Sequence, residues 1–81
     1  MAYYVYMIKT IKPSKLKTYV GYTDNISKRL EKHNSGKGAK STRGYQWRLI
    51  YKRYFNDKFK AMSYEYKLKN NRKKRYALLN K

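Results

Sequence analysis

The 81-residue sequence has no cysteine, a single histidine and only four acidic residues. Without cysteine the chain cannot form a disulfide, a zinc knuckle or a thiol nucleophile, and one histidine cannot make a conventional zinc site. Any metal ion would therefore be a hard one, bound through oxygen. No segment approaches the roughly 18 apolar residues that a membrane helix needs, and no signal-peptide pattern opens the sequence. We expect a soluble, cytoplasmic protein that does not enter membranes.

Basic residues dominate what is present. The chain carries 22 lysines and arginines and has a formal net charge of +18, far more than solubility requires. A polyanion is therefore the expected partner. Eleven tyrosines, two phenylalanines and one tryptophan supply the bulk of a small core. Because each tyrosine keeps a hydroxyl that must find water or a partner, we expect some of them to line a wet groove.

Two strands are predicted near the start of the chain. Residues 2–9 place apolar side chains on both faces, which indicates a strand at the centre of a sheet. A polar connection over residues 10–17 leads to a second strand over residues 17–22, so the two should pair as a hairpin.

The hairpin should bring two tyrosines together. Antiparallel pairing would set Tyr6 beside Tyr19, and Gly21 would lie on the same face as Tyr19. There Gly21 either leaves a gap where a phosphate approaches the backbone and a phenol together or marks a bulge in the strand.

Capping residues and apolar patterns predict the remaining elements. We expect a helix from its N-cap Asp24 to about Asn34, a third strand over residues 47–55, a helix over residues 58–69 capped by Asn56-Asp57, and a last short helix beginning at Asn71. The sequence thus predicts a single α/β (α+β) domain over residues 1–81. Its three-stranded antiparallel sheet would be flanked by helices in the order β-β-α-β-α-α.

A loop over residues 36–44 separates the first helix from the third strand. It looks too polar to pack and carries Lys37, Lys40 and Arg43. It either folds over a phosphodiester backbone or is a solvated linker.

Glu65 is the unusual member of the four acidic residues. Asp24 and Asp57 occupy predicted N-caps and Glu31 faces solvent beside lysines, whereas Glu65 falls in the apolar arc of its helix. A carboxylate there is costly unless a cation meets it. Glu65 is therefore either the ion-pair partner of a lysine or arginine, or a ligand for Mg²⁺ or Mn²⁺ completed by water and phosphate oxygens.

Several of these residues form an ordered set. Tyr4-Val5-Tyr6, Tyr19-Val20-Gly21, Arg29 ten positions after Tyr19, and Glu65 resemble the signature triplets, arginine and glutamate of the GIY-YIG endonuclease superfamily. The run from His33 to Gly44 resembles its small single-domain, YhbQ-like branch. Tyr4 replaces the first glycine of the signature, and no asparagine matches the one that many members carry well after the glutamate.

The resemblance implies metal-dependent hydrolysis of phosphodiester bonds in DNA, in repair or recombination. It implies the catalytic residues Tyr6, Tyr19, Arg29, His33 and Glu65, with Glu65 holding one Mg²⁺ or Mn²⁺ ion. Either tyrosine would take a proton from water, and Tyr19 is preferred because its strand leads into the Arg29 helix. Arg29 would steady the growing charge, and His33, one helical turn away, would relay a proton or bind phosphate unless it is structural.

A phenol must change its acidity to act as a base. Its ordinary pKa is about 10, so a base near neutrality needs that pKa lowered by about 3 units. The unusually cationic chain is suited to such a shift.

Other residues are expected to bind nucleic acid. Tyr22 stands where some relatives have a lysine and would offer its hydroxyl, together with Lys37, Lys40 and Arg43. DNA is the expected partner, with RNA as an alternative. The protein is expected to be a monomer or weak dimer, with a further protein partner for targeting left open.

Two non-enzymatic readings remain open. One is a basic nucleic-acid binder on the same scaffold that has no turnover, and the other is a small RNA-associated protein of ribosomal character. Glu65 distinguishes the nuclease from these two alternatives, because a protein that only binds nucleic acid has no need of an acid inside a basic groove.

We predict that affinity for DNA falls steeply with salt. If about five phosphates are neutralised on a duplex, a fourfold rise in salt lowers the affinity roughly 500-fold. Replacing Lys37, Lys40 and Arg43 together by alanine should lower both the affinity and the salt slope, measured by fluorescence anisotropy. A flat titration would contradict electrostatic binding, and unchanged binding by the triple variant would make the loop a linker.

Overall fold

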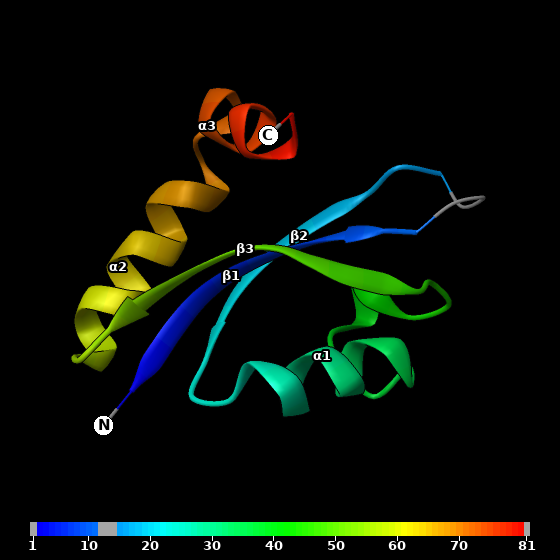
Figure 1. Cartoon of the computed structure of the whole chain (residues 1–81), viewed down its shortest axis with the longest axis horizontal. Coiled ribbons are helices and arrows are strands. Elements are labelled where there is room, and N and C mark those ends of the chain that lie inside the picture. The colour runs from blue at the N-terminus through cyan, green and yellow to red at the C-terminus, as the bar shows by residue number, and fades with distance from the viewer. Residues whose placement is uncertain (1, 12–14, 81) are drawn as a thin grey trace.

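The structure is a computed structural model that describes residues 2–11 and 15–80. The elements in chain order are β1 (Tyr3–Thr10), β2 (Thr18–Thr23), α1 (Ile26–Asn34), the short 3-10 helix η1 (Lys40–Thr42), β3 (Trp47–Phe55), α2 (Lys58–Lys69) and α3 (Arg72–Leu79) (Figure 1). The predicted order β-β-α-β-α-α is confirmed. The predicted connection between the first two strands includes residues 12–14, which lie outside the described residues. Every helix in the described part of the chain is too short or too polar to span a bilayer.

The three strands form one antiparallel sheet in the order β2-β1-β3, so β1 is central as predicted. Its alternating side chains build two cores. Val5 and Met7 pack against α2 and α3 on one face, whereas Tyr6 and Ile8 pack with Trp47 and α1 on the other. Figure 1 shows α1 on one side of the sheet and α2 with α3 on the other. Because helices cover both faces, the middle of β1 is buried.

The helices begin at short polar caps, and one predicted cap is wrong. Asn25 rather than Asp24 caps α1: its side-chain oxygen accepts from the Lys28 backbone N–H at 3.1 Å. Asn25 is the last residue with extended backbone before the helix, so its side chain is the one that reaches the free N–H groups of the first turn. Asp57 and Asn71 cap α2 and α3 as predicted.

The loop between α1 and β3 does pack, contrary to the expectation from its polarity. Thr42 is completely buried, and the Trp47 indole N–H donates to the Thr42 carbonyl at 2.9 Å. The Asn34 side chain also bonds to both backbone groups of Trp47. Trp47 therefore holds the loop and the end of α1 against the start of β3, and the hydroxyl and carbonyl of the buried Thr42 are both hydrogen-bonded within the protein.

Gly21 makes room for the Tyr6 side chain. The two residues are partners in the β1–β2 register, and a Cβ atom built on Gly21 would lie 2.5 Å from the Tyr6 hydroxyl oxygen. The space over Gly21 is thus filled by a phenol, and the strand pairing is regular at this point. Both expectations for Gly21, a phosphate gap and a bulge, are wrong, because the glycine serves the packing of its cross-strand neighbour.

We predict that Gly21→Ala destabilises the fold by about 1–3 kcal/mol, the usual cost of overpacking a core. The methyl group has to displace a ring that is itself held by hydrogen bonds. The measurement is urea unfolding of Gly21→Ala, Tyr6→Ala and the double variant. Gly21→Ala should be nearly neutral in the Tyr6→Ala background, where the ring is gone. An equal cost in both backgrounds would contradict the packing argument.

Candidate active site

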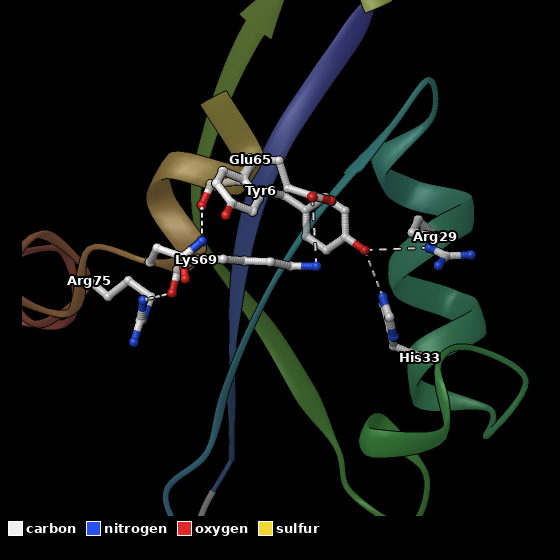
Figure 2. A network of polar contacts seen from close by, with 8 residues as sticks. Tyr6, Arg29, His33, Glu65, Lys69 and Arg75 are labelled. Carbon is white, nitrogen blue, oxygen red and sulfur yellow. Dashed lines mark hydrogen bonds and ion pairs between the residues drawn. The ribbon is translucent and has the colours of Figure 1, made fainter. Parts of the chain in front are cut away.

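Tyr6 occupies the centre of a cluster of polar and aromatic side chains. It is only 2% exposed, and its ring centroid lies 6.5 Å from that of Tyr19, which confirms that the two tyrosines are neighbours. The His33 ring lies 5.9 Å from Tyr6 and 5.0 Å from Tyr19. In Figure 2, Arg29 and His33 approach Tyr6 from α1, and Glu65 approaches from α2. The five predicted catalytic residues are therefore brought together.

Hydrogen bonds run in one direction through this centre. The Thr42 hydroxyl donates its only proton to the Ala39 carbonyl at 2.8 Å, so it accepts from His33 Nδ1, 2.9 Å away. The neutral ring then carries no proton on Nε2 and accepts from the Tyr6 hydroxyl at 2.8 Å. These partners assign the tautomer of His33. The Tyr6 O–H thus points at a basic nitrogen.

Arg29 approaches the same hydroxyl from α1. Its Nε–H donates to the Tyr6 hydroxyl oxygen at 3.4 Å. This hydrogen bond raises the pKa of Arg29 more than any other contact, and Tyr19 contributes less. Tyr19 was preferred for its place beside the Arg29 helix, but Tyr6 reaches Arg29 because its ring lies over Gly21.

Burial sets the charge states at the centre. Burial raises the pKa of Tyr6, and the opposing hydrogen bond and charge of Arg29 do not overcome it. The expectation that the cationic chain lowers this pKa is therefore wrong for Tyr6, because desolvation of a phenol outweighs one guanidinium. Burial, and then the charge of Arg29, lowers the pKa of His33. Near pH 7 Tyr6 is a neutral phenol and His33 a neutral imidazole.

Two functional roles were predicted for His33, a proton relay and phosphate binding, and the structure is compatible with only the first. The side chain is 0% exposed, so a phosphate cannot contact it. Both ring nitrogens are engaged, one by Tyr6 and one by Thr42. The geometry suits a proton relay.

Tyr19 lies at the mouth of the site. It is half-buried and lines a surface hollow together with Lys69. The Lys69 Nζ atom lies 5.8 Å from the centre of its ring, close enough for a cation–π interaction. Tyr19 thus links the buried centre to the charged surface.

Glu65 provides the acidic side of the site. Its side chain is 18% exposed, and Oε1 lies 3.6 Å from Lys69 Nζ, so the ion pair considered from the sequence is present. Within residues 2–11 and 15–80, no three His, Cys, Asp or Glu side chains gather around a common point. This donor set does not suit a zinc cage. It fits a Mg²⁺-type ion, which keeps most of its waters and binds one or two carboxylates plus substrate phosphates.

The residues predicted to bind nucleic acid lie apart from the centre. Tyr22 is half-buried on the opposite face of the sheet, packed against the core that contains Val5 and Met7. The side chains of Lys37, Lys40 and Arg43 are exposed on the loop that also contains Thr42.

Sequence reasoning missed two residues of the site. Thr42 gives no signal, because a threonine in a polar loop has many ordinary explanations. Lys69 had a signal: it follows Glu65 by four residues, the spacing at which a lysine on a helix meets a glutamate.

The fold and the paired tyrosines are those of a nuclease-type domain. The chain belongs to the GIY-YIG family, since the family model described as the GIY-YIG catalytic domain matches residues 2–77.

Similar proteins cover nearly all of the chain. It is 41% identical over 81 residues to a UPF0213 protein of Halalkalibacterium halodurans, a match that covers 98% of this chain and 83% of the relative. It is 50% identical over 62 residues to a UPF0213 protein of Bacillus licheniformis, covering 72% and 64%. The solution NMR structure of the UPF0213 protein from Bacillus halodurans is 41% identical, with a TM-score of 0.53 and coverage of 99% of this chain and 84% of that one.

We predict that the folded protein loses stability as the pH falls below 6.5, the ordinary pKa of histidine. Because the pKa of His33 is lowered in the folded state, the unfolded chain takes up a proton first, and stability falls until folded His33 also protonates. NMR titration of this single histidine gives its pKa directly, and urea unfolding at about pH 7.5 and about pH 5.5 measures the effect. His33→Gln should lose the pH dependence in this window. An ordinary pKa for His33 would contradict the assignment.

Proposed function

We propose that the protein is a metal-dependent endonuclease that hydrolyses phosphodiester bonds in DNA, acting in repair or recombination. The observation that carries the proposal is the pair of contacts on one hydroxyl. Tyr6 donates to His33 Nε2 and accepts from Arg29 Nε. A phenol needed only for packing would not require a buried base on one side and a guanidinium on the other.

Tyr6 is the group that takes the proton from water. As its oxygen accepts a proton from the attacking water, its own proton passes to His33 Nε2, so one O–H bond forms as the other breaks. No phenolate accumulates, which agrees with the raised pKa of Tyr6. Thr42 holds the Nδ1–H side of the ring, so His33 keeps Nε2 free to receive the proton. Tyr19, at the mouth, positions the water.

Arg29 holds the phosphoryl group. Its guanidinium has five N–H donors, and the Nε–H is the one given to Tyr6. The planar fork can therefore hold phosphoryl oxygens while Nε keeps the guanidinium beside the base. This places the positive charge where negative charge develops in the transition state.

Glu65 is the residue that would hold a Mg²⁺ or Mn²⁺ ion. Such an ion, when bound, stabilises negative charge on the leaving oxygen. The Lys69 side chain that now pairs with Glu65 is 45% exposed, so it is able to turn away and bind a phosphate instead.

A second candidate function is nucleic-acid binding without turnover, and the ion pair between Glu65 and Lys69 favours it. That pair satisfies the carboxylate with no metal ion. The two functions therefore differ in what Glu65 does.

Glu65→Gln is expected to abolish cleavage while leaving the fold and DNA affinity nearly intact, because it keeps the shape and removes the charge. The wild-type protein is incubated with branched, nicked, single-stranded and linear duplex DNA in Mg²⁺, Mn²⁺ or EDTA, and with RNA in parallel. Glu31→Gln, a change at an exposed acid on α1, is the matched control. Metal-dependent cutting that persists in Glu65→Gln would remove Glu65 from the mechanism. If the wild-type protein cuts none of these substrates, nucleic-acid binding without turnover becomes the favoured function.

Tyr6→Phe is expected to lower the single-turnover cleavage rate by about 10²- to 10⁴-fold, the usual contribution of a general base. Tyr6→Phe should lower the rate more than Tyr19→Phe, because Tyr6 and not Tyr19 is hydrogen-bonded to His33. This order is the reverse of the one expected from the sequence. Tyr54→Phe, at an exposed position of β3, should cut at the wild-type rate. Melting temperatures check that the ring still packs. Wild-type rates in Tyr6→Phe would make that tyrosine a core residue.

A further inference from the structure

A second surface feature adjoins the site and has no role in the mechanism above. A hollow of about 390 Å³ lies between α3 and the residues that lead into β2. We call it the side groove, and it is lined by Leu16, Lys17, Thr18, Arg72, Arg75, Tyr76 and Leu79. A smaller hollow of about 240 Å³ shares Thr18 and Arg75 with it and reaches Tyr19 and Lys69. The side groove is thus continuous with the mouth of the candidate active site.

The two hollows are cationic throughout. Their charged lining residues are Lys17, Lys69, Arg72 and Arg75, and among residues 2–11 and 15–80 no carboxylate lines either of them. Arg75 lines both, and its Nη1 donates to the carbonyls of Leu68 and Lys69, which fixes the guanidinium at the corner between α2 and α3. In Figure 2, Lys69 lies between Arg75 and Tyr6. A line of cations therefore leads from the side groove to the catalytic hydroxyl, suited to consecutive phosphates of one strand.

The side groove also has an aromatic and apolar wall. Tyr76 is 50% exposed and Leu16 is 60% exposed, although both are large enough to prefer burial. The Arg72 guanidinium stacks 5.5 Å from the Tyr76 ring centre, with Nη2 3.4 Å from its hydroxyl. A nucleobase can stack on an exposed aromatic ring while neighbouring cations bind its phosphate. The volume falls in the range of small-ligand sites, about 300–1,000 Å³, which suits a nucleotide and is too small for a base-paired duplex.

We propose that the side groove binds one unpaired nucleotide of the strand whose scissile phosphate lies at Tyr6 and Arg29. The base packs against Tyr76 and Arg72, and the phosphates that connect it to the site lie on Arg75 and Lys69. This inference rests on the proposed function and narrows its substrate. The preferred DNA has an unpaired nucleotide beside the cleaved bond, as in a flap, a branch or a single strand.

The test measures binding in EDTA, so that no strand is cut. Fluorescence anisotropy compares a labelled duplex carrying a short single-stranded extension with a blunt duplex of equal length. Wild-type protein should prefer the extended duplex. Tyr76→Ala should weaken binding of the extended duplex about tenfold or more, the usual loss of one base–aromatic stack, and should leave the blunt duplex unchanged. Tyr66→Ala is the matched control, because Tyr66 is a helical tyrosine that is 69% exposed and lies outside the groove.

A second pair of variants tests the charge and guards against misfolding of Tyr76→Ala. Arg72→Gln should lower the slope of log affinity against log salt by about 0.7 on the extended strand. Arg48→Gln, at an exposed position of β3 that lines neither hollow, should leave this slope unchanged. Equal effects of Tyr76→Ala and Tyr66→Ala, or of Arg72→Gln and Arg48→Gln, would overturn the proposal.

The outcomes for the groove and for the nuclease are separable. If the wild type cuts DNA in Mg²⁺ but Tyr76→Ala keeps the full preference for an extension, the groove proposal fails and the nuclease stands. If the preference is lost in Tyr76→Ala while the wild type cuts nothing in any metal, the groove stands as a binding site and the proposed reaction fails.

Discussion

The packing of one phenol over one glycine organises the site. Tyr6 belongs to the central strand, and its hydroxyl reaches α1 only because the ring passes over Gly21 in the neighbouring strand. Any other residue at that position would hold the ring away from the helix. Arg29 and His33 would then lose their common partner, and the buried polar groups on α1 would be left without compensation. The regular antiparallel register is therefore a chemical requirement as well as a structural one.

The centre of the site is neutral in a chain whose formal net charge is +18. A buried imidazolium would be repelled by Arg29 and deprived of water, so His33 stays uncharged and its Nε2 accepts the hydrogen bond of Tyr6. The hydrogen-bond chain ends on a backbone carbonyl at Ala39, which has no proton to exchange and so fixes the direction of the chain. Among the described residues, every buried side-chain nitrogen or oxygen has a hydrogen-bond partner. Apart from Arg29, which contacts Tyr6, the cations of this region line the hollows at the mouth of the site.

Much of this arrangement was predictable from local patterns. Alternation and capping gave the strands and helices, and the pairing of two short strands gave the contact between Tyr6 and Tyr19. Contacts that span the chain were not predictable in detail. The partner of Tyr6 is 27 residues away, and Thr42 reaches His33 from a loop whose composition suggested solvent. The cap of α1 was misplaced by one residue because Asp24 and Asn25 have almost equal preference for that position.

The energetics of Glu65 bear on the choice between an enzyme and a binder. An i,i+4 ion pair at a surface contributes about 0.3–0.5 kcal/mol, and Lys69 is largely in water. Glu65 itself is mostly withdrawn from water on a helix whose neighbouring Ala61 and Leu68 are buried. Replacing a carboxylate in such a setting by an apolar side chain is often neutral or stabilising. Stability therefore gives little reason for an acid at this position, whereas the metal ion that we propose there gives a direct one.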